Sequence, residues 1–135
     1  MIESIQTVVG RASATRPVCG EDGQIRSIVN LTRAIEAAVG RRDVISAMLA
    51  LATLRDVLAR HFAREERAME GLPSHDVSRH AHEHRALLSG LGAIHCAIVS
   101  ENLPRLSDQV AAYVNRVARH VIEQDVPLSE DLAAA

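Results

Sequence analysis

Histidine and acidic side chains recur at intervals of four or five residues in two stretches of this sequence, HFAREERAMEGLPSHDVSRHAHEH and RHVIEQD. The candidate ligands that these stretches supply are His61, Glu65, His80, His84, His120 and Asp125. Imidazole and carboxylate ligands without a thiolate suit iron, manganese or zinc. A set of this size exceeds what a tetrahedral zinc needs, and two carboxylates able to bridge favour a dinuclear centre.

These side chains must be brought together inside a folded core. His61, Glu65, His80 and His84 fall on the apolar stripes of helical patterns, where charged groups are costly unless they are paired or bound to a metal. Residues four apart lie on one helix face, about 6 Å from each other. Each of the two pairs is therefore predicted to form a two-ligand clamp.

The spacing of apolar residues predicts the elements that carry these clamps. Four amphipathic helices with short connections are expected, at about 22–39, 43–70, 74–101 and 104–125. This pattern is typical of an all-α fold, an up-down-up-down antiparallel four-helix bundle with an N-terminal arm. The expected organisation is an arm at 1–21, a bundle at 22–128 and a C-terminal tail at 129–135. Pro127 is expected to prevent continuation of the last helix.

Residue counts from the loops place the candidate ligands at one depth of this bundle. Glu65 should be level with His80 across the second loop, and His84 level with His120 across the third. Asp125 lies five residues beyond His120, about 140° around a straight helix. A loosened last turn would help the Asp125 carboxylate to reach inward.

The overall composition restricts the class of protein. Hydrophobic residues make up 47% of the chain but aromatic residues only 1%, Phe62 and Tyr113, so the core must be aliphatic. A net charge of −2 of mixed sign indicates no nucleic-acid or anionic membrane surface. No apolar run approaches the roughly 20 residues of a membrane span, and the N-terminus does not resemble a signal peptide. Cys19 and Cys96 suggest no disulfide framework, and we expect a soluble cytoplasmic protein.

Other polar residues are expected to have ordinary structural roles. His95 falls on the third helical stripe and is predicted to be a core histidine with a hydrogen-bond partner. Tyr113 is predicted to lie in the core, with gating or hydrogen bonding as the alternative. His82, Glu66 and Glu70 are predicted to face solvent.

The motifs together resemble the hemerythrin family over roughly residues 20–128. HFAREERAM resembles that family's HFxxEExxM run, and RHVIEQD resembles its last ligand motif. The resemblance implies a four-helix bundle and a non-haem di-iron centre with an oxo or hydroxo bridge. It further implies that one iron is held by His80, His84 and His120, the other by His61, and that Glu65 and Asp125 bridge them.

One position departs from the family pattern. Hemerythrins carry a further histidine in a DxQH run of the first helix, and this chain has Ile25 there, with no histidine before His61. In the family, the iron served by that histidine is the one that binds O₂. Either Asp22, Glu21, Cys19 or solvent completes the second iron, or only one iron is firmly held.

Three functions follow from the resemblance and the departure. The preferred hypothesis is a protein that binds O₂ or NO for sensing, storage or transfer. An iron with more open positions would instead suit an iron-dependent peroxidase-like or oxidase-like enzyme. The third hypothesis is an interaction module with a degenerate site, switched by metal, with a protein partner or a second copy of the chain as its target.

Overall fold

The computed structural model describes residues 21–72, 76–100 and 103–134, without the side chains at 21–24, 103–104 and 129. The helices are α2 (Glu21–Gly40), α3 (Val44–Met69), α4 (Val77–Val99), α5 (Leu103–His120) and α6 (Val126–Ala134), and the π-helical segment η1 (Val121–Asp125) joins the last two. The described ranges contain no β-strand. The prediction of an all-α fold is confirmed.

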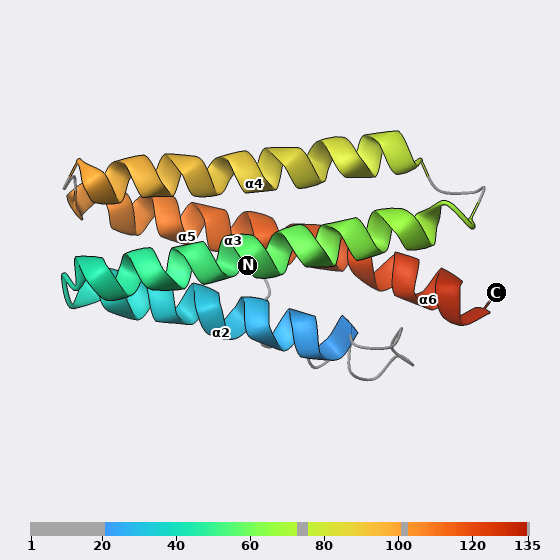
Figure 1. The fold of residues 1–135 in the computed structure, drawn as a ribbon, viewed down its shortest axis with the longest axis horizontal. Helices are drawn as coiled ribbons and strands as arrows, with labels where there is room; N and C mark the ends of the chain where they lie inside the picture. The colour runs from blue at the N-terminus through green and yellow to red at the C-terminus, as the bar shows by residue number, and fades with distance from the viewer. Residues whose placement is uncertain (1–20, 73–75, 101–102, 135) are drawn as a thin grey trace.

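The four long helices lie alongside one another (Figure 1). α2 packs against α3 and α5, and α4 packs against the same two helices, so the four form a closed bundle around one core. α5 leads through η1 into α6 (Figure 1). The arm was expected at residues 1–21. Residues 1–20 lie outside the described part of the chain, and Glu21 is the first residue of α2.

Both helices that carry the clamps begin at an aspartate. The Asp43 carboxylate accepts hydrogen bonds from the backbone N–H of Ser46 at 3.1 Å and from its hydroxyl at 2.6 Å. These hydrogen bonds lower the pKa of Asp43. Asp76 accepts from the backbone N–H of Arg79 at 3.0 Å. Each carboxylate satisfies a backbone donor that a first helical turn leaves without a partner, which fixes where α3 and α4 start.

The buried face of α4 follows a coiled-coil repeat rather than a straight-helix stripe. Its larger buried residues follow one another at spacings of four and three, and the buried Ala81 and Ala97 flank this series: His80, His84, Leu87, Leu91, Ile94 and Ile98. A repeat of 3.5 residues drifts about 20° per heptad from the 3.6 of a straight helix. The prediction that His95 is a core residue was wrong, because this drift turns Ile94 inward and leaves His95 exposed.

The last helix does not end at Asp125, as the following proline had suggested. α6 begins at Val126 and continues through Pro127 to Ala134. A proline clashes with the carbonyl four residues earlier in a regular helix interior, but it fits the first turn of a helix. η1 interrupts the regular ladder just before Pro127, so the proline lies in the first turn of α6.

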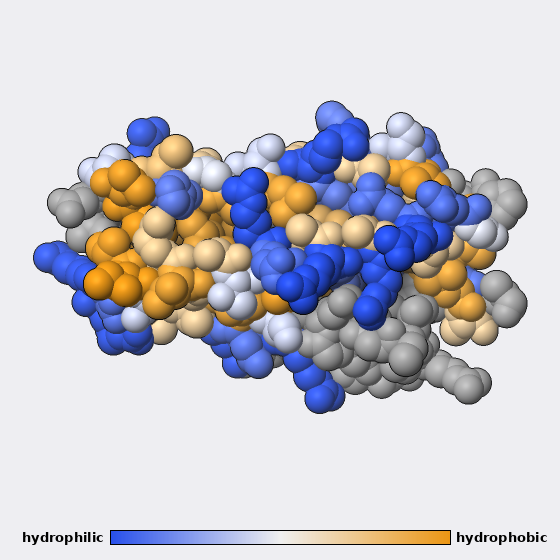
Figure 2. Space-filling model, viewed as in Figure 1, coloured by the Kyte–Doolittle hydropathy of each residue, from blue (hydrophilic) through white to orange (hydrophobic). Residues whose placement is uncertain are grey.

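The surface differs between the two ends of the bundle. Figure 2 shows apolar surface gathered at the end where α3 begins and α4 ends. The exposed large hydrophobic side chains there are Val44, Ile45, Leu49 and Val99. No helix in the described ranges has the length and apolar character needed to cross a membrane.

Candidate metal centre

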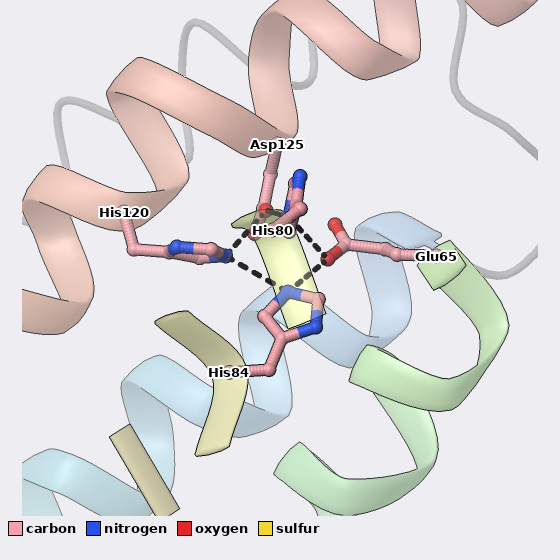
Figure 3. Close-up of side chains that lie close together, drawn as sticks. All are labelled: Glu65, His80, His84, His120 and Asp125. Atoms are coloured by element: carbon pink, nitrogen blue, oxygen red, sulfur yellow. Dashed lines mark hydrogen bonds and ion pairs between the residues drawn. The ribbon is translucent and has the colours of Figure 1, made fainter. Parts of the chain in front are cut away.

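All six candidate ligands are buried, although each carries a polar head group. Five of them offer one ligand atom each within 4.8 Å of one another: Glu65, His80, His84, His120 and Asp125. Figure 3 shows these side chains converging from α3, α4, α5 and the end of η1. Four segments far apart in sequence therefore supply a single group of nitrogen and oxygen atoms.

His61 lies beside this group and contacts both carboxylates. Its Nε2 atom lies 3.1 Å from Oε1 of Glu65 and 3.2 Å from Oδ2 of Asp125. The structure thus brings the sixth predicted residue to the cluster, on the side of these two oxygens.

The other oxygen of each carboxylate faces the remaining histidines. Oε2 of Glu65 lies 3.1 Å from Nε2 of His84 and 3.6 Å from Nε2 of His80. Oδ1 of Asp125 lies 2.9 Å from Nε2 of His120 and 3.9 Å from Nε2 of His80. Each carboxylate therefore extends between His61 on one side and the three-histidine group on the other.

The π-helical segment explains how Asp125 reaches its place. The N–H of Val126 donates to the carbonyl of Val121, five residues back, where a regular helix would bond to the residue four back. The wider turn brings residues five apart closer to one side of the helix. The loosened turn predicted from the His120–Asp125 spacing is present, and both side chains are buried.

Acidic and basic side chains face each other in the cluster and shift each other's pKa values. Burial alone would lower the pKa of His61, but hydrogen bonds to Asp125 and Glu65 raise it to about 10. Burial likewise opposes charge on His120, while Asp125 and then Glu83 raise its pKa to about 9. Burial would raise the pKa of Glu65, yet the imidazoles around it hold that pKa well below its usual range. Raised imidazole pKa values at His61 and His120 thus accompany a lowered carboxyl pKa at Glu65.

The donor atoms fit a cation. The buried Oε1 and Oε2 of Glu65, Nε2 of His80 and Oδ1 of Asp125 make no well-aligned hydrogen bond with the described residues, and only imidazole and carboxylate groups face them, at 2.9–3.9 Å. Poorly aligned contacts between buried polar atoms are costly, and a bound ion would satisfy these atoms. Ligands at about 2.1 Å from a cation stand roughly 3 Å apart in octahedral geometry. The donor separations of 2.9–3.9 Å lie near that spacing.

Two glutamates outside the predicted set contact the cluster. The Nδ1 atom of His84 lies 3.3 Å from Glu66, and the Nδ1 atom of His120 lies 3.1 Å from Glu83. The prediction that Glu66 faces solvent was only partly right, because about a third of its side chain is exposed and its carboxylate turns inward. Glu83 was missed, and its sole sequence signal is its position next to His84.

The two aromatic residues of the chain are buried, and one of them contacts the cluster. The ring of Phe62 stacks on His84 at a centroid distance of 3.9 Å and 6° between planes. Tyr113 is buried, as predicted, and its hydroxyl donates to the carbonyl of Leu87 at 2.8 Å. A Cβ atom at Gly90 would lie 2.9 Å from the Tyr113 ring, so glycine permits this close approach. An apolar layer thus borders the polar cluster.

The position that departs from the hemerythrin pattern is buried. Ile25 belongs to the apolar core cluster and lies on α2, which packs against both α3 and α5. Of the proposed substitute ligands, Cys19 and the side chains of Glu21 and Asp22 lie outside what the structure describes.

Comparisons with known proteins agree with the site. The family model described as the hemerythrin HHE cation binding domain matches residues 20–125, which contain all six candidate ligands. No curated protein and no solved structure matches the chain. A match across most of the sequence, over a helical bundle with a buried histidine and carboxylate cluster, establishes that the chain belongs to the hemerythrin HHE cation-binding family.

Proposed function

We propose that this chain is a non-haem di-iron protein that binds O₂ or a related small ligand such as NO, for sensing, storage or transfer. The proposal includes an up-down-up-down antiparallel bundle as the scaffold of the metal pair. An iron pair supplies the electrons and the open coordination position that binding of such a ligand requires. The chain itself must hold the metals, orient their ligands and exclude water.

The division of the carboxylate oxygens carries this proposal. Oε2 of Glu65 and Oδ1 of Asp125 join three imidazole nitrogens in one donor group. Oε1 of Glu65 and Oδ2 of Asp125 join Nε2 of His61 in a second, smaller group. Two donor groups that share both carboxylates are what bridging ligands of a metal pair provide. If only a single cation were bound, in the first donor group, His61 would interact with the two carboxylates by hydrogen bonding alone.

The second donor group has fewer protein ligands than the first. His61 supplies its imidazole, and the two carboxylates supply one oxygen each. The first-helix histidine of the family pattern is replaced by Ile25, which is buried in the apolar core. Fewer protein ligands leave coordination positions for solvent or for a small external ligand. The exchangeable position is therefore assigned to the metal on the His61 side.

The surroundings of the cluster favour binding of a small uncharged ligand. Phe62 stacks on His84, and the core beyond it consists of aliphatic side chains. An apolar surround limits the entry of water, which would compete for the open position and promote loss of the bound ligand.

The first test is the iron content of protein purified without oxygen and supplied with Fe²⁺. We expect about two irons per chain, and a new ligand-to-iron charge-transfer band when air or NO is admitted. An Asp125→Asn variant should lose both, whereas Asp56→Asn, an exposed aspartate on α3, should keep them. Wild-type protein that takes up no iron overturns the proposal.

The number of irons bound per chain and the reaction with peroxide distinguish the proposal from its alternatives. About one iron per chain without the band would mean that Ile25 has eliminated the second metal. Repeated consumption of added peroxide without loss of iron would instead favour the peroxidase-like enzyme. In Ile25→His, a more persistent ligand complex is expected, because the added imidazole supplies a further anchor for the second metal.

A further inference from the structure

Two glutamates that point inward from the edge of the bundle contact the far sides of two imidazoles in the cluster. Glu66 on α3 lies 3.3 Å from Nδ1 of His84 on α4, and Glu83 on α4 lies 3.1 Å from Nδ1 of His120 on α5. Both contacts therefore cross from one helix to the next. About a third of each glutamate side chain is exposed, while the two imidazoles are almost fully buried.

These contacts determine which nitrogen of each imidazole faces the cluster as a lone pair. A carboxylate only accepts hydrogen bonds, so Nδ1 of each histidine must donate its hydrogen outward to the glutamate. A neutral imidazole with hydrogen on Nδ1 carries its lone pair on Nε2. The Nε2 atoms of His84 and His120 lie 3.2 Å apart inside the cluster, where either a proton on one of them or a cation between them would relieve the repulsion of two facing lone pairs.

The geometry points to Glu66 and Glu83 as positioning residues that hold His84 and His120 in the metal-binding orientation and tautomer, and so set the affinity of the centre for its metal. This inference rests on the proposed metal function. Carboxylates that accept from metal-bound histidines fix the ring and make the nitrogen a stronger ligand. Neither glutamate is a ligand in the proposed site.

The pattern follows from neighbouring positions on one helix. Glu66 directly follows the ligand Glu65, and Glu83 directly precedes the ligand His84. Successive helical residues point about 100° apart, so one side chain enters the core while its neighbour lies at the boundary with the next helix. Each such pair of residues supplies a ligand from its own helix and an anchor for a ligand on the following helix.

The test measures Co²⁺ affinity by competition with a chromophoric chelator. Glu66→Ala and Glu83→Ala should each bind Co²⁺ roughly 10-fold to 100-fold more weakly than wild type. The Gln variants keep an acceptor oxygen but lose the charge, and should lose roughly threefold to tenfold. Glu36→Ala and Glu36→Gln, which change an exposed glutamate on α2, are the matched controls and should bind as wild type does.

A second readout observes the hydrogen bonds directly. In the Co²⁺-loaded protein, the Nδ1 hydrogens of coordinated imidazoles give strongly shifted proton resonances that exchange with solvent. Removal of Glu66 should accelerate exchange of the His84 resonance and leave that of His120 slow, and removal of Glu83 should do the reverse. A merely structural loss would not select one resonance in this way.

The outcomes distinguish the inference from the function on which it rests. Wild-type protein that binds neither Co²⁺ nor Fe²⁺ overturns the proposed function, and this inference with it. Wild-type binding with Ala variants within twofold of it, and with both slow resonances retained, overturns only the positioning role. The Gln variants keep the side-chain volume, so they carry the same test if an Ala variant does not fold.

Discussion

The two halves of this four-helix bundle differ in how their buried side chains are stabilised. In the aliphatic half, where α3 begins and α4 ends, side chains such as Leu54, Leu91 and Ile94 are almost completely buried and need no partner beyond one another. In the ligand half, where α3 ends and α4 begins, equally buried side chains include Glu65 and Asp125. Burial stabilises the first half directly, whereas the second half requires a counter-charge.

This difference indicates that packing stability and the proposed metal binding depend on different halves of the fold. None of the candidate ligands lies in the aliphatic half, so its packing should not depend on a metal. In the proposed function, the ligand half would exchange protons on its imidazoles for a cation, so its contribution to stability would depend on what is bound. Changes in one half should therefore leave the characteristic property of the other intact.

The largest expected effect comes from removing a shared acid in the ligand half. Glu65→Gln removes the charge that lies between His61 and the three-histidine group. Metal at a thousandfold excess over its dissociation constant should stabilise wild type by about 4 kcal/mol, and the variant should lose this gain. Thermal unfolding with and without Zn²⁺ or Fe²⁺ measures the difference, with exposed Glu70→Gln as control. A variant with the full metal-dependent gain would contradict the assignment.

A cavity in the aliphatic half should have the converse effect. Leu54 is completely buried, and Leu54→Ala should lower the free energy of unfolding by about 2–5 kcal/mol. The number of metals bound per folded chain should not change, because Leu54 is not among the donor residues. Urea unfolding and metal analysis of the same sample test both statements. Loss of metal from a folded variant would show that the halves are coupled.

Tyr113 lies where the two halves meet. Removal of its hydroxyl should have a smaller effect on the free energy of unfolding. Tyr113→Phe removes the hydrogen bond to the Leu87 carbonyl and should cost about 1 kcal/mol. Metal affinity should change little, since the ring and its packing remain. Denaturant unfolding gives the first quantity and chelator competition the second. A large fall in affinity would instead place Tyr113 in the function of the ligand half.

The smallest effect concerns acid sensitivity at the start of α3. The hydrogen bonds from Ser46 depress the pKa of Asp43, so its carboxylate adds stability above its unfolded pKa, and this stability disappears as pH falls through the lower folded value. Asp43→Asn keeps an acceptor oxygen but has no charge to lose. Its unfolding free energy should therefore fall less steeply between about pH 4 and pH 2. An identical slope in both proteins would exclude Asp43 as a contributor.

Sequence patterns predicted which polar side chains would lie together in the core because the signals of these candidate ligands are local. A polar residue on an apolar stripe, repeated at four-residue spacing, requires a buried partner whatever the details of packing. Loop counting then placed Glu65 and His80 at one depth, and the structure brings them within 3.6 Å. The same signals predicted the helices, whose starts at Asp43 and Asp76 are set by their own side chains.

The features that sequence missed depend on neighbouring helices. His95 was placed inward because a straight-helix repeat was assumed, while packing in the bundle imposes the shorter coiled-coil repeat on α4. Pro127 was read as a helix end because η1 has no sequence signal strong enough to predict the start of a second helix. The contacts of Glu66 and Glu83 cross to other helices, which residue spacing along one helix does not reveal.

The position of Tyr113 should also make the intrinsic fluorescence of the protein sensitive to metal in the cluster. The chain has one tyrosine and no tryptophan, so its ultraviolet fluorescence comes almost entirely from this buried ring. Tyr113 lies two turns before His120 on the same helix, about 10 Å along the axis. Iron in the cluster would absorb where tyrosine emits and would quench it by energy transfer. Loading and release of the metal should therefore be visible in the emission of the unlabelled protein.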